Sequence, residues 1–188
     1  MFRSFLLVIL ATALVVIEGA APSSFFDFTL KDIDGNDVPL THFRNRVTLV
    51  VNVASYCGYT DSHYAGLVDL WKEFEPTEGL HILAFPCNQF GKQEPGTSDE
   101  IKAFAESKGV TFHMMEKIDV NGPNTSELYK YVKAQAGVDK ITWNFATYFL
   151  VAKDGVTVHA FSNTEPKDLR TKIIELIGYH VEPYAEEL

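Results

Sequence analysis

A continuous apolar run, followed by a short turn that carries a cysteine, constrains the fold of this chain more than any other feature. The run spans residues 47–53, VTLVVNV, and most of its members are β-branched. Because its apolar residues do not alternate with polar ones, the run predicts a strand buried on both faces, as central parallel strands are. Beyond the turn we expect a helix that Thr60, Asp61 or Ser62 could cap. Its apolar positions recur at helical spacing: Tyr64, Leu67, Val68, Trp71 and Phe74.

The cysteine in this turn, Cys57, is the first candidate functional residue. It lies between the carboxyl end of the predicted strand and the amino end of the predicted helix, where open α/β sheets place their chemistry. Unpaired N–H groups at a helix start favour an anion, so we expect the Cys57 thiol to ionise more readily than a free one. Gly58 allows backbone and substrate to approach closely. The competing interpretation is an inert buried cysteine or half of a structural disulfide.

Size and charge narrow the class of protein. With 188 residues, 46% of them hydrophobic, the chain is long enough for a single globular domain with its own core. The net charge is −9, and neither Lys nor Arg clusters along the sequence. Since no basic stripe is available to neutralise phosphates, a nucleic-acid partner is excluded. The six histidines show no metal-ligand spacing, so neither a metal nor another cofactor is expected.

Both ends of the chain resemble targeting signals. Residues 1–20, MFRSFLLVILATALVVIEGA, combine an early positive charge, an apolar run and small residues, which is typical of a secretory signal peptide. The apolar run is shorter than the about 20 residues of a membrane span, although an uncleaved signal anchor is the alternative. The last four residues, Ala185-Glu186-Glu187-Leu188, resemble an ER-retention signal without its basic first residue. We therefore expect one domain over residues 21–188, in the endoplasmic reticulum lumen or secreted. Asn124-Thr125-Ser126 is a glycosylation sequon.

The rest of the chain alternates between strand and helix patterns. An Asp-Gly pair at positions 34 and 35 predicts an N-terminal β-hairpin over residues 26–40. Further strands are predicted at 81–85, 114–120, 148–152 and 156–161, and helices at 98–107, 126–136 and 166–177. Residues 86–96 are too rich in Pro and Gly for regular structure, and they should form a loop at the sheet edge where Cys57 lies. This order predicts a central mixed sheet flanked by helices.

Three ordered blocks of sequence resemble the signature motifs of glutathione peroxidases. They are NVASYCGYT at 52–60, FPCNQFG with QEP at 85–95, and WNF at 143–145. The resemblance extends over residues 26–177 and implies a thioredoxin-like α/β fold. The secretory start and the acidic-Leu end make the chain resemble the cysteine-containing, ER-lumenal branch of the family, glutathione peroxidases 7 and 8.

Carried onto this sequence, the resemblance implies that Cys57 is the peroxidatic residue and that Gln89, Trp143 and Asn144 are its partners. Amide and indole N–H groups are neutral donors, which can stabilise a thiolate and the alkoxide that leaves. The Cys57 thiolate would attack a hydroperoxide and become a sulfenic acid. Glutathione or a protein dithiol such as protein disulfide isomerase would then reduce it, in a response to oxidative stress.

The other cysteine, Cys87, could act as the resolving thiol if the two Cα atoms come within about 7 Å. Thioredoxin-dependent members of the family carry their resolving cysteine in a helix that corresponds to residues 104–108, where this chain has none. The chain also lacks the insertion that precedes the WNF block in tetrameric members. We therefore expect a monomer without tight glutathione binding.

Two other classes of protein fit parts of the pattern. One is a thiol-disulfide oxidoreductase or folding factor without peroxidase turnover, although Thr60 stands where a CxxC motif needs its second cysteine. The other is a secreted binding module in which Cys57 and Cys87 form an inert staple. In the loop between the blocks, the charged residues Lys92, Glu94 and Glu100 are expected to form a solvated rim.

Overall fold

The structure, a computed structural model, describes residues 21–75 and 79–178. A five-stranded sheet at its centre has the order β5-β4-β3-β6-β7. Its strands are β3 (Val47–Val53), β4 (Leu80–Pro86), β5 (His113–Met114), β6 (Thr147–Val151) and β7 (Val158–Ser162). The helices are α1 (Thr60–Phe74), α2 (Ser98–Ser107), α3 (Glu127–Ala136) and α4 (Arg170–Ile177). Short 3-10 turns lie at Phe25–Asp27, Leu40–Phe43 and Pro166–Leu169.

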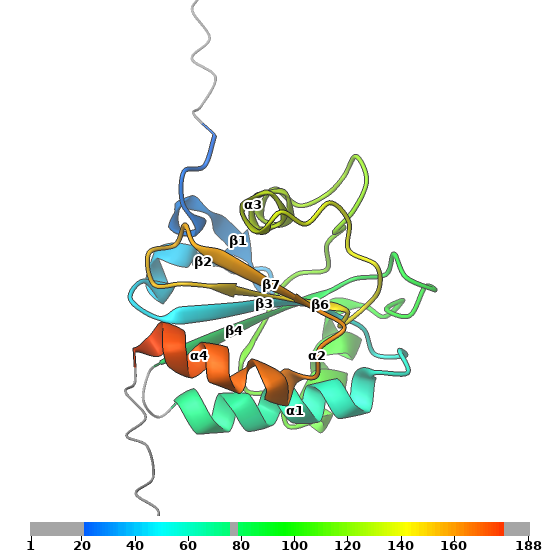
Figure 1. Ribbon diagram of the computed structural model, residues 1–188. Coiled ribbons are helices and arrows are strands. Elements are labelled where there is room, and N and C mark those ends of the chain that lie inside the picture. Colours follow the sequence, from blue (N-terminus) through cyan, green and yellow to red (C-terminus); the bar gives the residue numbers. More distant parts are fainter. Residues whose placement is uncertain (1–20, 76–78, 179–188) are drawn as a thin grey trace, which may run out of the picture.

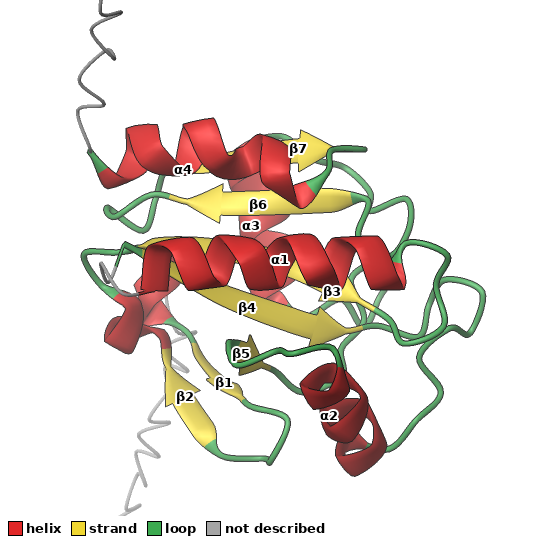
Figure 2. Cartoon of the chain, turned by 90° about the horizontal axis from the view of Figure 1, so that it is seen from below, coloured by secondary structure: helices red, strands yellow, loops and turns green. Residues whose placement is uncertain are grey.

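The apolar run of the sequence forms the central strand of this sheet. All seven residues of β3 are buried, and β3 pairs in parallel with β4 and antiparallel with β6. Its main chain is hydrogen-bonded on both edges and its side chains are covered on both faces, which explains why the run does not alternate. The mixed, thioredoxin-like α/β sheet expected from the sequence is confirmed (Figure 2).

Helices cover both faces of the sheet. In Figure 1, α1 and α4 lie below it and α3 lies above it. The odd-numbered side chains of β3, such as Val51, pack into the core on the α1 side, whereas Val50 packs into a second core with residues of α3. This separation follows from the two-residue period of a strand, and it decides below which face each cysteine joins.

The predicted N-terminal hairpin is also present. β1 (Thr29–Lys31) pairs antiparallel with β2 (Asp37–Pro39), and Lys31 lies opposite Asp37. The carboxylate of Asp32 closes the turn by accepting hydrogen bonds from the N–H groups of Asp34 and Asn36. Gly35 has a φ of 83°, a left-handed conformation that favours glycine, which explains why the Asp-Gly pair marked the position correctly.

Two predicted elements differ from the structure. The strand expected at 114–120 is reduced to β5, because beyond Met115 the chain meets β4 only at intervals, as where the Ile118 N–H donates to the Pro86 carbonyl. The last helix begins with the 3-10 turn at Pro166–Leu169 before α4. The predicted signal peptide, the retention signal and the end of the helix at 76–78 lie outside the described residues. Within the described ranges, no helix has the length and apolarity needed to cross a bilayer.

Candidate active site

Cys57 occupies the predicted junction between β3 and α1. Its thiol is unpaired, and only 7% of the residue is exposed. The loop around it is fixed by Thr60, whose hydroxyl accepts a hydrogen bond from the Cys57 N–H at 3.1 Å and donates one to the Ala54 carbonyl at 2.7 Å. Thr60 therefore braces the cysteine loop instead of capping α1, since the cap position falls on Tyr59 and has no side-chain hydrogen bond.

Three loops that are distant in sequence meet at this edge of the sheet, on the right of Figure 1. β3 and β4 run in parallel and end at the same edge, and β6 begins there because it runs antiparallel to β3. The first two loops are joined directly, since the Tyr56 N–H donates to the Gln93 carbonyl at 3.0 Å. The expectation that the loop at 86–96 lies beside the cysteine loop is confirmed.

Three side-chain amides form a connected series at this edge. Asn144, in the third loop, donates through Nδ2 to Oε1 of Gln93 at 3.3 Å. Its Oδ1 accepts from Nδ2 of Asn52 on β3 at 3.2 Å. The same Asn52 Nδ2 also donates to the main-chain carbonyl of Trp143 at 3.3 Å. The third block is thereby tied both to the central strand and to the second loop.

The structure corrects the role expected for Gln89. Its Oε1 accepts from the N–H groups of Val120 and Asn121, and its Nε2 donates to the Asn121 carbonyl at 2.8 Å. With its amide held by the main chain at 120–121, Gln89 serves as a brace for that loop and not as a donor to Cys57. The glutamine that joins Asn144 is Gln93, four positions further on, which the sequence reasoning quoted only as part of the QEP block.

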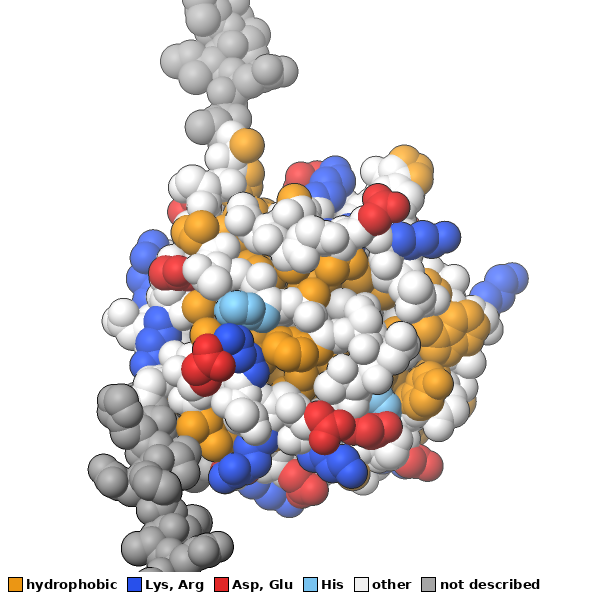
Figure 3. Space-filling model, in the orientation of Figure 1, with side chains coloured by type: hydrophobic (Ala, Val, Ile, Leu, Met, Phe, Trp, Pro, Cys, Tyr) orange, Lys and Arg blue, Asp and Glu red, His pale blue; other side chains and the backbone are white. Residues whose placement is uncertain are grey.

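Trp143 lies at the surface of the same edge. It is 39% exposed, and its ring contacts that of Phe90 with 5.8 Å between centroids. With Tyr59, His63 and Glu165 it lines a cavity of about 500 Å³ beside the cysteine loop. Figure 3 shows hydrophobic side chains gathered at this edge, on the right of the molecule. The cavity beside Cys57 is therefore bordered mainly by aromatic side chains, with Glu165 as the carboxylate of its lining.

Among the described residues, no group makes a hydrogen bond to the sulfur of Cys57. The donors at this edge, the amides of Gln93 and Asn144 and the indole of Trp143, are neutral. Such bonds are often long or misaligned without substrate and tighten in the reacting complex. The geometry thus provides a small buried thiol with uncharged donors gathered in the neighbouring loops.

Cys87 lies in a different environment. It is fully buried, and it packs in the core on the α3 side of the sheet, whereas Cys57 packs on the α1 side. Burial raises the pKa of the Cys87 thiol to about 11, so the thiolate needed for disulfide formation is scarce at neutral pH. The sheet between the two cysteines gives no support to the predicted resolving role of Cys87 or to an inert Cys57–Cys87 disulfide.

The expectation of a solvated rim is wrong for Glu94. Lys92 and Glu100 are exposed, but Glu94 is fully buried beneath the cysteine loop. The Ser55 hydroxyl donates to its Oε1 at 2.7 Å, while its Oε2 has no partner among the described residues. Burial raises the pKa of this carboxyl group, an effect that the bond from Ser55 and the charge of Lys117 oppose.

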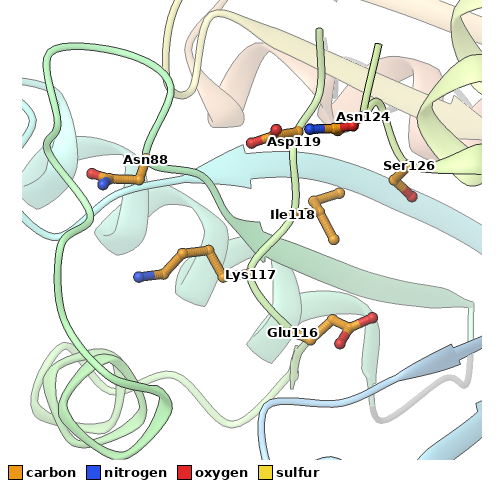
Figure 4. Close-up of a pocket in the computed structure, with 7 residues that line it drawn as sticks. All are labelled: Asn88, Glu116, Lys117, Ile118, Asp119, Asn124 and Ser126. Carbon is orange, nitrogen blue, oxygen red and sulfur yellow. The ribbon is translucent and has the colours of Figure 1, made fainter. Parts of the chain in front are cut away.

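A second hollow of about 460 Å³ lies on the far side of the loop at 86–96 (Figure 4). Asn88 and residues 116–119 line it together with Asn124 and Ser126 of the sequon. Its walls carry both signs of charge, and Cys57 does not line it. In the described part of the chain, no three His, Cys, Asp or Glu side chains are grouped in a way that could hold a metal ion.

An unpaired cysteine at the strand–helix junction of a thioredoxin-like sheet, with neutral amide donors in the adjoining loops, is the arrangement of a thiol-dependent redox enzyme. Comparison with known proteins narrows this class. The glutathione peroxidase family model matches residues 25–133, more than half of the chain. The chain belongs to the glutathione peroxidase family, and it is a peroxidase.

Similar proteins cover most of the chain. A putative chloroplastic glutathione peroxidase 7 of Arabidopsis thaliana is 46% identical over 169 residues, 87% of this chain and 72% of that protein. A probable phospholipid hydroperoxide glutathione peroxidase of Nicotiana sylvestris is 43% identical over 166 residues, 86% of this chain and 97% of that protein. The crystal structure of T. cruzi GPX1 superposes with a TM-score of 0.68 at 33% identity, covering 82% of this chain and 97% of that one.

Proposed function

We propose that this protein reduces hydrogen peroxide and organic hydroperoxides through Cys57, with an external thiol as the reductant. The observation that carries the proposal is the position of Cys57. Its unpaired thiol lies beside the loop of Gln93, which is hydrogen-bonded to Asn144. The names of relatives such as the Nicotiana protein favour organic, including lipid, hydroperoxides as substrates.

In the first step the Cys57 thiolate attacks the distal oxygen of the hydroperoxide. The S–O bond forms as the O–O bond breaks, the sulfur is oxidised by two electrons to a sulfenic acid, and an alkoxide or hydroxide leaves and takes up a proton. N–H groups of Gln93, Trp143 and Asn144 would stabilise both the thiolate and the leaving oxygen. Neutral donors suit this role because they lower the energy of the anion without protonating it.

In the second step two external thiols restore Cys57. The first thiol forms a mixed disulfide with the sulfenic acid and releases water, and the second displaces Cys57 as a thiol. An external reductant is favoured because Cys87 is buried in the other core of the sheet. Glutathione and a protein dithiol of the protein disulfide isomerase type are the two candidates. The aromatic border around Cys57 favours a protein over a small charged peptide.

We also propose that the enzyme is a monomer of the cysteine-containing, ER-lumenal branch that acts in the response to oxidative stress. The leader at 1–20 and the acidic-Leu end support this location. Fusing residues 185–188 to a secreted reporter tests the retention signal. Full secretion of the reporter would exclude retention.

The function is tested on the reduced protein with one equivalent of hydrogen peroxide, followed by dimedone trapping and intact mass. The wild type should form a sulfenic acid much faster than free cysteine does. Cys57→Ser should abolish the reaction, and Cys87→Ser, the matched control, should retain it. Peroxide consumption by the Cys57→Ser variant would exclude the proposal.

The same experiment addresses the alternative, a thiol-disulfide oxidoreductase without peroxidase turnover. That class requires reaction with peroxide at the rate of free cysteine, together with rapid exchange with disulfide substrates. The proposed peroxidase should instead react with peroxide much faster than free cysteine does and exchange only slowly with disulfide substrates. A wild-type protein that reacts no faster than free cysteine would favour the alternative.

A further inference from the structure

Asn52 is the one amide side chain in the otherwise hydrophobic or hydroxyl-bearing run of β3, and it is fully buried. Its neighbours on the strand are valines, which pack at that depth without an unsatisfied polar atom. The Oδ1 of Asn52 has no hydrogen-bond partner among the described residues, which makes the residue costly where it stands. An apolar side chain at this position would make the fold more stable than Asn52 does. The presence of an amide therefore indicates that its Nδ2 group has a role other than packing.

The main-chain carbonyl of Trp143 fixes the orientation of Asn52. A carbonyl can only accept, so the edge of the Asn52 amide that faces it at 3.3 Å must be the NH₂ edge. The reverse orientation would place Oδ1 of Asn52 against the carbonyl oxygen. The positions of the Nδ2 and Oδ1 atoms of Asn52 therefore follow from the need of the Trp143 carbonyl for a donor.

The orientation of the Asn52 amide then fixes the orientations of the next two amides, those of Asn144 and Gln93. Because Asn52 presents its NH₂ group, Asn144 must present Oδ1 to it, at 3.2 Å. The NH₂ group of Asn144 is thereby directed to Gln93, which must present Oε1, at 3.3 Å. The Nε2 group of Gln93 is left as the free end of the series, in the loop whose carbonyl holds Tyr56 beside Cys57.

We propose that Asn52 is a positioning residue that sets the polarity of this amide series, so that Gln93 offers an N–H group and not a carbonyl oxygen to the reacting sulfur. The inference rests on the proposed function of Cys57. A glutamine at the end of such a series could otherwise turn either way, and a carbonyl facing the sulfur would destabilise the thiolate.

The main chain supports the same role. The Phe145 N–H donates to the Asn52 carbonyl at 2.9 Å, so Asn52 holds the segment 143–145 through both its side chain and its main chain. Phe145 has a φ of 59°, a left-handed conformation that is unfavourable for an aromatic residue. Strain of this kind persists where the surroundings fix the backbone. Here the main-chain bond to Asn52 does so, together with ring contacts from His63 and Tyr64.

The test replaces Asn52 with Leu, which has a similar volume and no amide. We expect the rate of Cys57 sulfenic acid formation to fall by about tenfold, as for the loss of part of an anion-stabilising site. The midpoint of the pH dependence of Cys57 alkylation by iodoacetamide should rise by about one pH unit. A purely structural role would lower the melting temperature and leave that midpoint unchanged.

Thr48→Val is the matched control. Thr48 lies on the same strand and, four residues away, on the same face, and its buried hydroxyl has no partner among the described residues. The control should leave both rate and midpoint unchanged. If Asn52→Leu does not fold, Asn52→Asp keeps the shape. Its ionised carboxylate can only accept, so at a pH high enough to ionise it the variant should turn Asn144 and then Gln93 around and slow the reaction further.

A double-mutant cycle with Gln93→Ala decides whether Asn52 acts through Gln93. If it does, Asn52→Leu should cause no further loss of rate in the Gln93→Ala background. Equal losses in both backgrounds, or an unchanged rate and midpoint in the folded single variant, would overturn the inference. A wild-type protein no faster than free cysteine would instead overturn the proposed function, so the two failures can be told apart.

Discussion

The hydroxyl of Thr60 allows the strongest test of how the cysteine loop is built. Replacing Thr60 with Val preserves the shape of the side chain and removes one donor and one acceptor. The Cys57 N–H and the Ala54 carbonyl then lose their bonds of 3.1 and 2.7 Å to this hydroxyl. Both groups belong to buried residues, so water cannot readily replace the lost partner.

The expected cost follows from these two groups. A buried polar group left without a partner costs about 1–3 kcal/mol, so the two together cost about 2–6 kcal/mol. Relaxation of the short loop should bring the result toward the lower half of that range. Since a domain of this kind is stabilised by only about 5–15 kcal/mol, such a loss would be plain in a urea unfolding curve at pH 7.

Thr60→Ser is the control, because it keeps the hydroxyl and loses only a methyl group, at a cost of about 1 kcal/mol. We also expect Thr60→Val to slow sulfenic acid formation, since the peptide group that positions Cys57 is released. If the free energies of unfolding of the Val and Ser variants agree within about 0.5 kcal/mol, the hydroxyl is not what holds the loop and this reasoning is refuted.

Two further predictions concern stability. Gly155 has a φ of 72°, and a Cβ there would lie 2.5 Å from the Phe26 ring, whereas Gly137, with a φ of 67°, has open space. Gly155→Ala should therefore cost about 3 kcal/mol or more and Gly137→Ala only about 1 kcal/mol, and equal melting temperatures would contradict this. Burial, with nearby positive charge, lowers the pKa of His81 from 6.5 to about 4. Below pH 6.5 the unfolded chain binds a proton that the native state does not, so up to about 3 kcal/mol should be lost by pH 4. His81→Gln should flatten this slope in urea unfolding at several pH values, and an unchanged slope would refute the assignment.

Much of the fold could be predicted because local patterns and tertiary structure agree. The run at 47–53 is buried on both faces, and the Asp34-Gly35 turn forms where its chemistry favours one. The strand expected at 114–120 stops early because the chain leaves β4. The Glu116 N–H donates to the Lys31 carbonyl of β1, and at the far end the Val120 N–H donates to the side chain of Gln89. No periodicity in the sequence can reveal a partner of that kind.

The site was predicted less completely, for a related reason. Gln89 and Gln93 lie in one irregular loop, where no strand or helix period tells which way each points. Only the contacts with Asn121 and Asn144 separate their roles. Glu94 was assigned to the surface because carboxylates are rarely buried, and nothing local indicates that Ser55 meets it.

The position of Cys87 could have been inferred from strand parity. Leu83, Phe85 and Cys87 alternate along β4 and its extension, and all three belong to the core on the α3 side. A residue in that register packs away from α1 and hence away from Cys57. Cys57 itself lies outside any strand, so no alternation of side chains predicts the face of the sheet on which it packs. Only the structure shows that face.

The separation of the two sulfur atoms by a sheet has a consequence for how long an enzyme molecule survives. A peroxidase that forms a disulfide within its own chain protects its oxidised sulfur, whereas under the mechanism proposed here a sulfenic acid at Cys57 would wait for an external thiol. During that delay a second peroxide molecule can carry the sulfur on to the sulfinic acid, which ordinary thiols do not reverse. The working lifetime of each molecule would then be set by the local ratio of thiol to peroxide.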